Sequence, residues 1–271
     1  MGRFDGTVAF VTGAARGQGR SHAVRFAKEG ADVIAVDICK QIPSVDIPLA
    51  TPSDLGETVR LVEALGRRIV WAEADVRDAS ALEKVVAEGV STLGRIDFVI
   101  ANAGVVSMGT DEPDPLQAFR DVVDVNLTGV WNTVTLSLPT LLAQGRGSVV
   151  ITSSTAGIKG IGGPSGGGQG YAASKHAVVG LMRNFVMNYS AQGIRFNTVH
   201  PTGVNTPMIV NELMAKIFAE APDMADAAKN LLPVDMVEPD DISNAVLWLC
   251  SEEARYVTGV ALPIDAGFTV R

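Results

Sequence analysis

The chain has 271 residues, 47% of them hydrophobic, which is enough to bury the core of one large α/β domain. Its 22 Lys and Arg against 30 Asp and Glu give a net charge of −8, which argues against nucleic acid and anionic membranes as partners. No run reaches the length of a membrane span and the N-terminus lacks the apolar core of a signal peptide, so we expect a cytoplasmic protein. Cys39 and Cys250 form neither a disulfide framework nor a metal-ligand spacing, and we expect no metal.

Short apolar runs alternate with amphipathic stretches along the chain. The early runs are rich in Val, Ile or Phe and are followed by Gly, Asp or Asn, as expected for strands buried on both faces of a parallel sheet. We expect strands at 7–13, 31–37, 68–75, 96–104, 147–154, 194–201 and 259–267. Helical patterns lie between them, at 17–30, 81–94, 116–142 and 171–192. This alternation predicts a doubly wound sheet with helices on both faces, interrupted by the segments 39–66 and 205–237.

The first motif is a glycine-rich turn between the first strand and the first helix. It places Gly13, Gly17 and Gly19 where backbone N–H groups can approach a pyrophosphate at the positive end of a helix dipole. A purely structural turn is the alternative, but Asp37 closes the next strand, where a ribose 2′-hydroxyl would be bound. That carboxylate would repel a 2′-phosphate and favours NAD over NADP. Arg16 argues the other way, and we give Asp37 more weight because it faces the ribose directly.

Two later strand ends fit the same ligand. Asp75 and Val76 follow the third strand and are placed to hold the adenine edge. The sequence Asn102-Ala103-Gly104 ends the fourth strand at the carboxyl edge of the sheet, where ligands bind in such folds. Each alone would be a strand-terminating turn, but together with the glycine turn they favour a cofactor site.

The second motif is a tyrosine and a lysine four residues apart, Tyr171 and Lys175, on one face of a predicted helix. A nearby ammonium and a positive nicotinamide ring would both lower the pKa of the phenol and make it a usable base. Such pairs are common by chance, but this one follows the strand GSVVITSS, whose terminal hydroxyls are placed to orient a substrate oxygen. Asn126, a polar residue within a helical pattern, either caps a local kink or holds a water connected to Lys175.

The motifs TGAARGQG, ANAG, VNLTG, ITSS, YAASK and HPTGVNTP occur in the order and approximate spacing of the short-chain dehydrogenase/reductase family, which the chain resembles from Gly6 to about Gly267. The resemblance implies a Rossmann-type single domain over 1–271 and a catalytic tetrad. In it Tyr171 is the general acid/base, Ser154 binds the substrate oxygen, Lys175 lowers the tyrosine pKa and binds the nicotinamide ribose, and Asn126 completes a water-linked proton relay.

The same resemblance implies a cofactor site and an assembly. A loop beginning at Pro201 would cover the nicotinamide, with Val204 and Thr206 on its carboxamide. Family members are commonly tetramers, which pair through the two long helices and the C-terminal strand. The predicted cofactor-binding residues are Gly13, Arg16, Gly17, Gln18, Gly19, Asp37, Ile38, Asp75, Val76, Asn102, Ala103, Gly104, Tyr171, Lys175, Pro201, Thr202, Gly203, Val204 and Thr206.

Two features depart from the usual family pattern. Ser154 and Tyr171 are further apart than usual, and the extra residues fall in a glycine-rich run that we expect to be an irregular tether forming one wall of the substrate pocket. An insert lies at about 39–66. These features resemble the carveol-dehydrogenase-like, mycofactocin-associated branch, in which the insert is thought to hold NAD tightly so that electrons leave through another redox carrier. An unstructured surface loop is the alternative.

The expected function is that of an NAD-dependent alcohol dehydrogenase or ketone reductase. The 205–237 segment, a predicted substrate lid, carries few charges around Met208, Ile209, Leu213 and Met214, which favours a lipophilic secondary alcohol such as a terpenoid. The alternatives are a non-catalytic NAD(H)-binding sensor or scaffold, and an enoyl or quinone reductase on the same fold.

Overall fold

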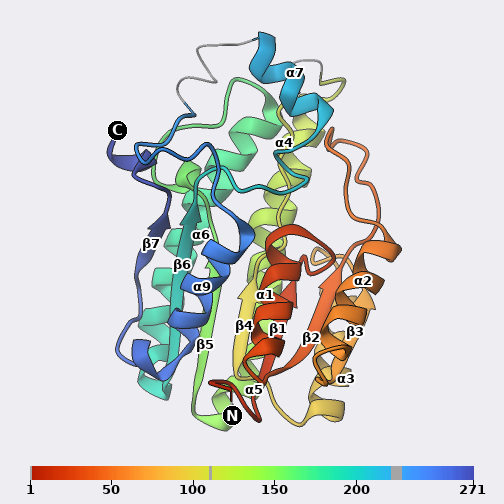
Figure 1. The fold of residues 1–271 in the computed structure, drawn as a ribbon, viewed down its shortest axis with the longest axis vertical. Coiled ribbons are helices and arrows are strands. Elements are labelled where there is room, and N and C mark those ends of the chain that lie inside the picture. The colour runs from red at the N-terminus through yellow and green to blue at the C-terminus, as the bar shows by residue number, and fades with distance from the viewer. Residues whose placement is uncertain (1, 110–111, 221–227) are drawn as a thin grey trace.

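The structure is a computed structural model that describes residues 2–109, 112–220 and 228–271, and a parallel β-sheet runs through its centre (Figure 1). Every strand lies inside a range predicted from the sequence. The strands are β1 Val8–Thr12, β2 Asp32–Asp37, β3 Ile69–Glu73, β4 Phe98–Ala101, β5 Gly147–Thr152, β6 Ile194–Pro201 and β7 Ala261–Ile264.

The strand order in the sheet is β3-β2-β1-β4-β5-β6-β7, and every neighbouring pair is parallel. The chain therefore builds outward in one direction to β3, returns to the centre, and builds outward in the other direction from β4. All residues of β1 and β4, at the centre, are buried, which explains their continuous apolar sequence. A ligand crevice is expected where the winding reverses, beyond the carboxyl ends of β1 and β4.

Helices cover both faces of the sheet, which confirms the doubly wound architecture (Figure 1). α1, α2 and α9 pack one core on one face, whereas α3, α5 and α6 pack a second core on the other. α7 lies beyond the carboxyl ends of the strands. The helices are α1 Gly17–Lys28, α2 Pro52–Glu63, α3 Ala79–Leu93, α4 Pro115–Val123, α5 Gly129–Gln144, α6 Gly166–Tyr189, α7 Glu212–Glu220 and α9 Pro239–Cys250. No helix of the described residues is long and apolar enough to cross a membrane.

The glycine-rich run differs from its prediction, because its second half is helical. Helix α6 begins at Gly166 rather than at Tyr171. A Cβ on Gly166 would lie 2.1 Å from the main-chain oxygen of Pro115, and one on Gly168 would lie 1.8 Å from that of Gly162. Within the run only Gly163 has a positive φ. Most of these glycines therefore serve close backbone packing rather than the unusual φ values expected of a tether.

Two further segments differ from their predictions. The helix expected at 116–142 is α4 and α5 joined by a π-helical turn, Asp124–Thr128, which contains Asn126. The segment 39–66 is irregular only as far as Ala50, because Thr51 and Asp54 form a reciprocal capping box that starts α2. The residues before α2 are not a free surface loop: Ile42, Val45 and Ile47 are buried in an apolar cluster with residues of β4–α4.

Candidate active site

A cavity of about 320 Å³ opens at the carboxyl edge of the sheet, above the reversal between β1 and β4. It runs from the glycine turn before α1 to Tyr171 on α6. All the cofactor-binding and catalytic residues predicted from the sequence line it, except Asn126. A set of residues scattered from Gly13 to Thr206 is thus brought to one site by the parallel topology, which places the ends of successive strands at one edge.

The glycine turn leaves the start of α1 open to this cavity. Gly13 and Gly17 have positive φ, and a Cβ on Gly19 would lie 1.9 Å from the main-chain oxygen of Gly13. Arg16 occupies the cap position of α1 without a side-chain capping bond, and the first turn has no acidic residue. Among the lining atoms, Oε1 of Gln18 is buried and has no hydrogen-bond partner. Free N–H groups at the start of a helix, in a glycine cradle, fit a bound pyrophosphate. The unpaired Oε1 of Gln18 is an acceptor and does not contribute to that fit.

Asp37 lies at the carboxyl end of β2, beside the glycine turn. Its carboxylate accepts hydrogen bonds from the main-chain N–H groups of Ala15 at 3.0 Å and Cys39 at 3.1 Å. Burial raises the pKa of this carboxyl, while those hydrogen bonds and the charge of Arg16 act in the opposite direction. The carboxylate is thus held at the pocket wall. At this end of the pocket it is placed to accept a hydrogen bond from the ribose of a bound dinucleotide.

Arg16 and Asp75 have partners that their sequence context did not reveal. The guanidinium of Arg16 donates to the main-chain oxygen of Pro48, so it is attached to the segment before α2. The carboxylate of Asp75 forms a 2.7 Å ion pair with Arg77, which also pairs with Asp121 at 2.7 Å. Both residues remain part of the pocket wall.

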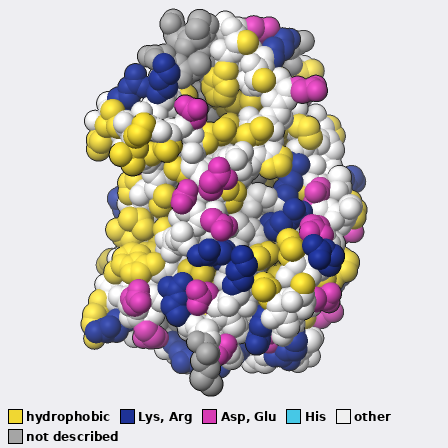
Figure 2. Space-filling model, viewed as in Figure 1, with side chains coloured by type: hydrophobic (Ala, Val, Ile, Leu, Met, Phe, Trp, Pro, Cys, Tyr) yellow, Lys and Arg dark blue, Asp and Glu magenta, His cyan; other side chains and the backbone are white. Residues whose placement is uncertain are grey.

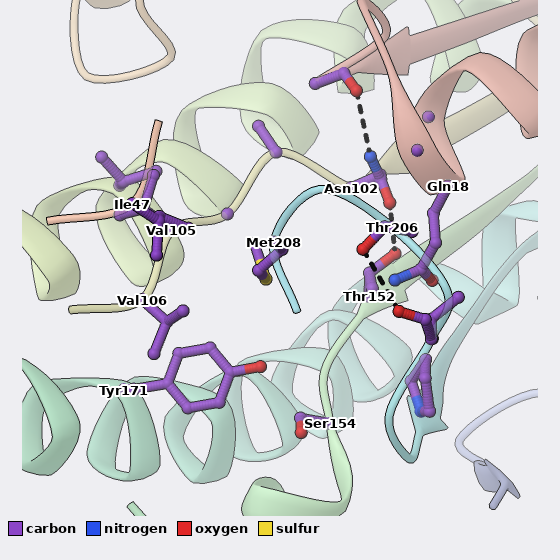
Figure 3. A pocket seen from close by; sticks show the side chains of 18 of the residues that line it. Gln18, Ile47, Asn102, Val105, Val106, Thr152, Ser154, Tyr171, Thr206 and Met208 are labelled. Carbon is purple, nitrogen blue, oxygen red and sulfur yellow. Dashed lines mark hydrogen bonds between the residues drawn. The ribbon is translucent and has the colours of Figure 1, made fainter. Parts of the chain in front are cut away.

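Asn102 connects the ends of neighbouring strands at the back of the pocket (Figure 3). Its amide nitrogen donates to the main-chain oxygen of Thr12 at 3.0 Å, and its amide oxygen accepts from the hydroxyl of Thr152 at 3.3 Å. The side chain therefore ties β1 to β5 across β4. These two hydrogen bonds, which join the strands, are a structural reason for an asparagine at the end of β4. A contact with a ligand would be a further reason.

The tyrosine, serine and lysine converge at the other end of the cavity. The hydroxyl of Tyr171 points into the pocket on the side of Ser154 (Figure 3). Lys175, one turn later on α6, is buried and donates from Nζ to the main-chain oxygen of Thr152 at 2.8 Å. Its Nζ lies 5.5 Å from the centroid of the Tyr171 ring. The hydroxyl of Ser153 in turn donates to the main-chain oxygen of Lys175 at 2.8 Å and fixes α6 to the end of β5.

Burial dominates the proton affinities of these groups. It raises the pKa of Tyr171, although a hydrogen bond with Ser154 works against it. It lowers the pKa of Lys175 to about 8. We expected the ammonium to lower the tyrosine pKa. The protein surroundings alone act in the opposite direction, because desolvation penalises the phenolate more than the neighbouring groups stabilise it.

Asn126 is the one predicted catalytic residue whose side chain does not reach the pocket. Its amide accepts from the N–H of Val105 at 2.8 Å and donates to the main-chain oxygen of Val105 at 2.9 Å. It also donates to the hydroxyl of Ser174 at 3.3 Å. A Cβ on Gly104 would lie 3.3 Å from both Asn126 Oδ1 and Lys175 Nζ, so these two polar groups flank the same glycine. The side chain closes the pocket wall from a π-helical turn, a backbone feature frequent at functional sites.

Comparison with known proteins bears on this arrangement. The profile of the family described as enoyl-(acyl carrier protein) reductase matches residues 13–269. A (−)-trans-carveol dehydrogenase of Rhodococcus erythropolis is 48% identical, with both chains covered completely. The chain belongs to the short-chain dehydrogenase/reductase family.

Solved structures of this family superimpose closely on the chain. The crystal structure of carveol dehydrogenase from Mycobacterium avium in complex with NAD is 47% identical, covers both chains completely and has a TM-score of 0.92. A short-chain dehydrogenase from Mycobacterium paratuberculosis bound to NAD has the same identity, coverage and TM-score. The Rossmann-type single-domain fold is therefore confirmed.

The sequence did not indicate two parts of this short-chain dehydrogenase/reductase site. His200 is fully buried and shares a 2.8 Å hydrogen bond between Nδ1 and the main-chain oxygen of Ser154, while its Nε2 lies 2.8 Å from the hydroxyl of Thr198. The adjacency of β5 and β6 could have suggested this contact, since Ser154 and His200 both lie near the ends of those strands. An apolar wall beside Tyr171 was also missed; Ile47, Val105 and Val106 belong to an apolar cluster against which Tyr171 packs (Figure 3), and Met108 and Ile161 also line the pocket.

Proposed function

We propose that the protein is an NAD-dependent oxidoreductase that interconverts a secondary alcohol and its ketone. The observation that carries this proposal is one cavity with Asp37 and an open glycine turn at one end and Tyr171, Ser154 and Lys175 at the other. The NAD-bound structures of close relatives support the choice of cofactor. The negative charge of the Asp37 carboxylate at the pocket wall would repel a 2′-phosphate, which favours the unphosphorylated ribose of NAD over NADP.

The residues at the two ends of the cavity divide the binding and the chemistry. The glycine turn and Gln18 would hold the pyrophosphate, Asp37 the adenosine ribose, and the loop 201–206 the nicotinamide end. NAD, when bound, supplies the ring that accepts or donates the hydride. The chain's own task is to orient the reacting groups and to move one proton.

Tyr171 would take the proton from the substrate hydroxyl during oxidation, or give it to the carbonyl oxygen during reduction. Ser154, on the same side of the cavity, would hydrogen-bond that oxygen. Lys175 would stabilise the phenolate through its charge. The position of Asn126 beside Lys175, across Gly104, supports a proton relay on the buried side of the site.

The substrate is proposed to be lipophilic and similar in class to carveol. The wall beside Tyr171 carries only apolar side chains, and Met208 and Ile209 from the 205–237 segment close the pocket on another side. Val204 and Val237 form a β-bridge at the base of this segment, so its two ends meet beside the cavity, as in a lid. A terpenoid alcohol would bury its hydrocarbon part against these side chains.

NAD is proposed to be retained between turnovers by the residues before α2. Ile42, Ile47 and Leu49 line the cavity, and three hydrogen bonds hold the segment down. These bonds join Arg16 to Pro48, Ser44 to Asp121, and Asp46 to the N–H of Gly109. A retained cofactor must be reoxidised in place, which would require an external redox carrier of the kind used with mycofactocin.

A homotetramer is the proposed assembly. Trp131 on α5 and Met187 on α6 are half or more exposed although both are large and apolar. Figure 2 also shows hydrophobic side chains gathered on the side of the molecule where β7 and the C-terminus lie. Exposed apolar patches on these elements suit helix and strand pairing between subunits. Light scattering after size-exclusion chromatography measures the assembly directly.

The second candidate is the reduction of an activated carbon–carbon double bond, which the description of the matching family profile favours. The deciding experiment uses freshly purified protein. Its bound NAD is quantified after dialysis, and turnover is then followed with secondary alcohols, with enones, and with or without an artificial electron acceptor. Alcohol oxidation that Tyr171→Phe abolishes supports the proposal. Full activity of Tyr171→Phe contradicts the mechanism, and the absence of any turnover with bound NAD would favour a sensor or scaffold.

A further inference from the structure

The first turn of α6, the helix that carries the proposed catalytic tyrosine, is capped by a side chain from a distant part of the chain. Glu112 Oε2 accepts from the N–H of Gly166 at 2.6 Å, and its Oε1 accepts from the N–H of Gly167 at 2.9 Å. Ser165 accepts from the N–H of Gly168 at 3.1 Å. The free donors at the start of a helix are thus satisfied mainly by one carboxylate that binds two of them at once.

The same turn is pressed against the segment that provides this carboxylate. A Cβ on Gly167 would lie 2.5 Å from Cβ of Ser107, and one on Gly170 would lie 2.9 Å from the main-chain oxygen of Phe119. Glycine is required at these positions because any side chain would push α6 away from the segment between β4 and α4. Glycine is also a poor helix former, so this turn depends on its tertiary contacts more than an ordinary helix start does.

Both elements joined by this contact carry residues that line the pocket. Val105 and Val106, from the segment after β4, lie in the apolar wall against which Tyr171 packs (Figure 3), and Met108 packs on the same apolar cluster. Tyr171 follows Gly167 by four residues, about one helical turn. A shift of the first turn of α6 would therefore displace the Tyr171 hydroxyl from Ser154 and from the wall that presents the substrate.

We propose that Glu112 is a positioning residue for Tyr171: its carboxylate clamps the glycine turn of α6 onto the β4–α4 segment and so sets the place of the catalytic hydroxyl. The proposal rests on the proposed dehydrogenase function. It assigns the glycine-rich run a role in alignment of the proton-transfer group. The negative charge of Glu112 also interacts favourably with the positive N-terminal end of the dipole of this 24-residue helix. An uncharged residue would lack this interaction.

The test compares Glu112→Ala and Glu112→Gln with Asp114→Ala. Asp114 is an acid in the same segment, but it caps its own helix by accepting from the N–H of Gln117 at 3.0 Å. The first measurement is the single-turnover rate of NADH formation from a secondary alcohol, with NADH affinity determined by fluorescence titration. We expect Glu112→Ala to lower the rate by about ten- to a hundredfold, since a misplacement of 1 Å has effects of this size, while NADH affinity stays within about twofold.

The second measurement is amide hydrogen exchange over α6, which needs no turnover. The N–H groups of Gly166 and Gly167 should exchange faster in Glu112→Ala than in the wild type or in Asp114→Ala. Glu112→Gln keeps one acceptor and should recover part of both the rate and the protection. A merely structural role would lower stability in all three variants without a selective loss of rate.

The outcomes separate the clamp from the function on which it rests. A wild-type rate in Glu112→Ala overturns the clamp, as does an equal loss of rate in Asp114→Ala. Should Glu112→Ala fail to fold, Glu112→Gln decides, and an unchanged rate with unchanged exchange at Gly166 and Gly167 overturns the proposal. A wild-type protein that oxidises no alcohol defeats the proposed function, while the exchange measurement still supports or refutes the clamp.

Discussion

Lys175 donates a 2.8 Å hydrogen bond to the main-chain oxygen of Thr152, the last residue of β5. This bond holds a buried ammonium 5.5 Å from the ring of Tyr171 and joins α6 to the strand that leads to Ser154. Thr152 thus sets the position of the charge through its backbone, while Ser153 holds the same helix turn through its hydroxyl. The alignment of α6 depends on contacts at both its start and its third turn.

Replacing Lys175 by Met should remove the positive charge that offsets the desolvation cost of a buried Tyr171 phenolate. We expect kcat for alcohol oxidation to fall by about a hundredfold or more, within the range of general acid–base effects. Since loss of a positive charge raises the pKa of a neighbouring phenol, and Tyr171 acts as a base in oxidation, the acid limb, on which the rate rises with pH, should move to higher pH. Steady-state rates across pH measure both effects. Lys84→Met, on the exposed side of α3, is the control, and an unchanged profile in Lys175→Met would show that the ammonium does not act on Tyr171.

Arg16→Ala should loosen the residues before α2, because its guanidinium donates to the main-chain oxygen of Pro48. We expect NADH to leave about tenfold faster, the equivalent of one charge-assisted hydrogen bond. Stopped-flow fluorescence with excess competing NAD gives the release rate. The matched variant is Arg60→Ala, which removes a guanidinium paired with Glu57 on the solvent side of α2. Equal release rates in wild type and Arg16→Ala would mean that this contact does not retain the cofactor.

The parts of this structure that could be predicted from sequence are those whose signal is local. The central strands are buried on both faces, so Val8–Thr12 and Phe98–Ala101 read as continuous apolar runs. The residues at their ends converge because parallel strands share a carboxyl edge, and this placed Asp37 and Asn102 correctly in one pocket. These inferences require only the order of elements along the chain.

The parts that could not be predicted depend on contacts between distant residues. Glycine disfavours helix, so the local sequence gave little support to a start of α6 at Gly166, although Ser165 caps it. The main reason for this start lies in Pro115 and Glu112, more than fifty positions earlier. The raised pKa that the protein surroundings alone give Tyr171 was not foreseen, because it depends on how completely the folded chain removes water from the phenol. The pairing of Asn126 with the backbone of Val105 likewise follows from tertiary packing.

Asp37→Asn should weaken the discrimination between NAD and NADP. The amide keeps an acceptor for only one of the two N–H groups of Ala15 and Cys39, which bond to different carboxylate oxygens, and it removes the charge that would repel a 2′-phosphate. We expect the ratio of affinities for the two cofactors to fall by about tenfold or more, the equivalent of ~1.4 kcal/mol. Fluorescence titration with NADH and NADPH measures the ratio. Asp75→Asn is the control, because the carboxylate of Asp75 is already paired with Arg77. If the affinity ratio of Asp37→Asn equalled that of the wild type, Asp37 would not determine which cofactor binds.

His22 should make the fold sensitive to acid. It is fully buried between α1 and α9, where its Nδ1 lies 2.8 Å from the hydroxyl of Ser243, and burial lowers its pKa from 6.5 to about 3. Below pH 6.5 the unfolded chain therefore binds a proton that the folded protein does not. This contribution to stability is complete above the unfolded pKa and is lost as pH falls from 6.5 toward 3, by at most ~1.4 kcal/mol per pH unit.

Urea titrations of the wild type and His22→Leu between pH 7 and 5 check this prediction. They give the slope of the unfolding free energy against pH for each protein. His22→Leu should have the shallower slope, with a difference of up to ~2 kcal/mol accumulated by pH 5. His176→Gln is the control, because it removes an exposed imidazole from α6. Burial also lowers the pKa of His200, so part of the slope will persist in His22→Leu. Parallel titrations of the wild type and His22→Leu would contradict the assignment, because the buried imidazole would then titrate alike in the folded and unfolded chain.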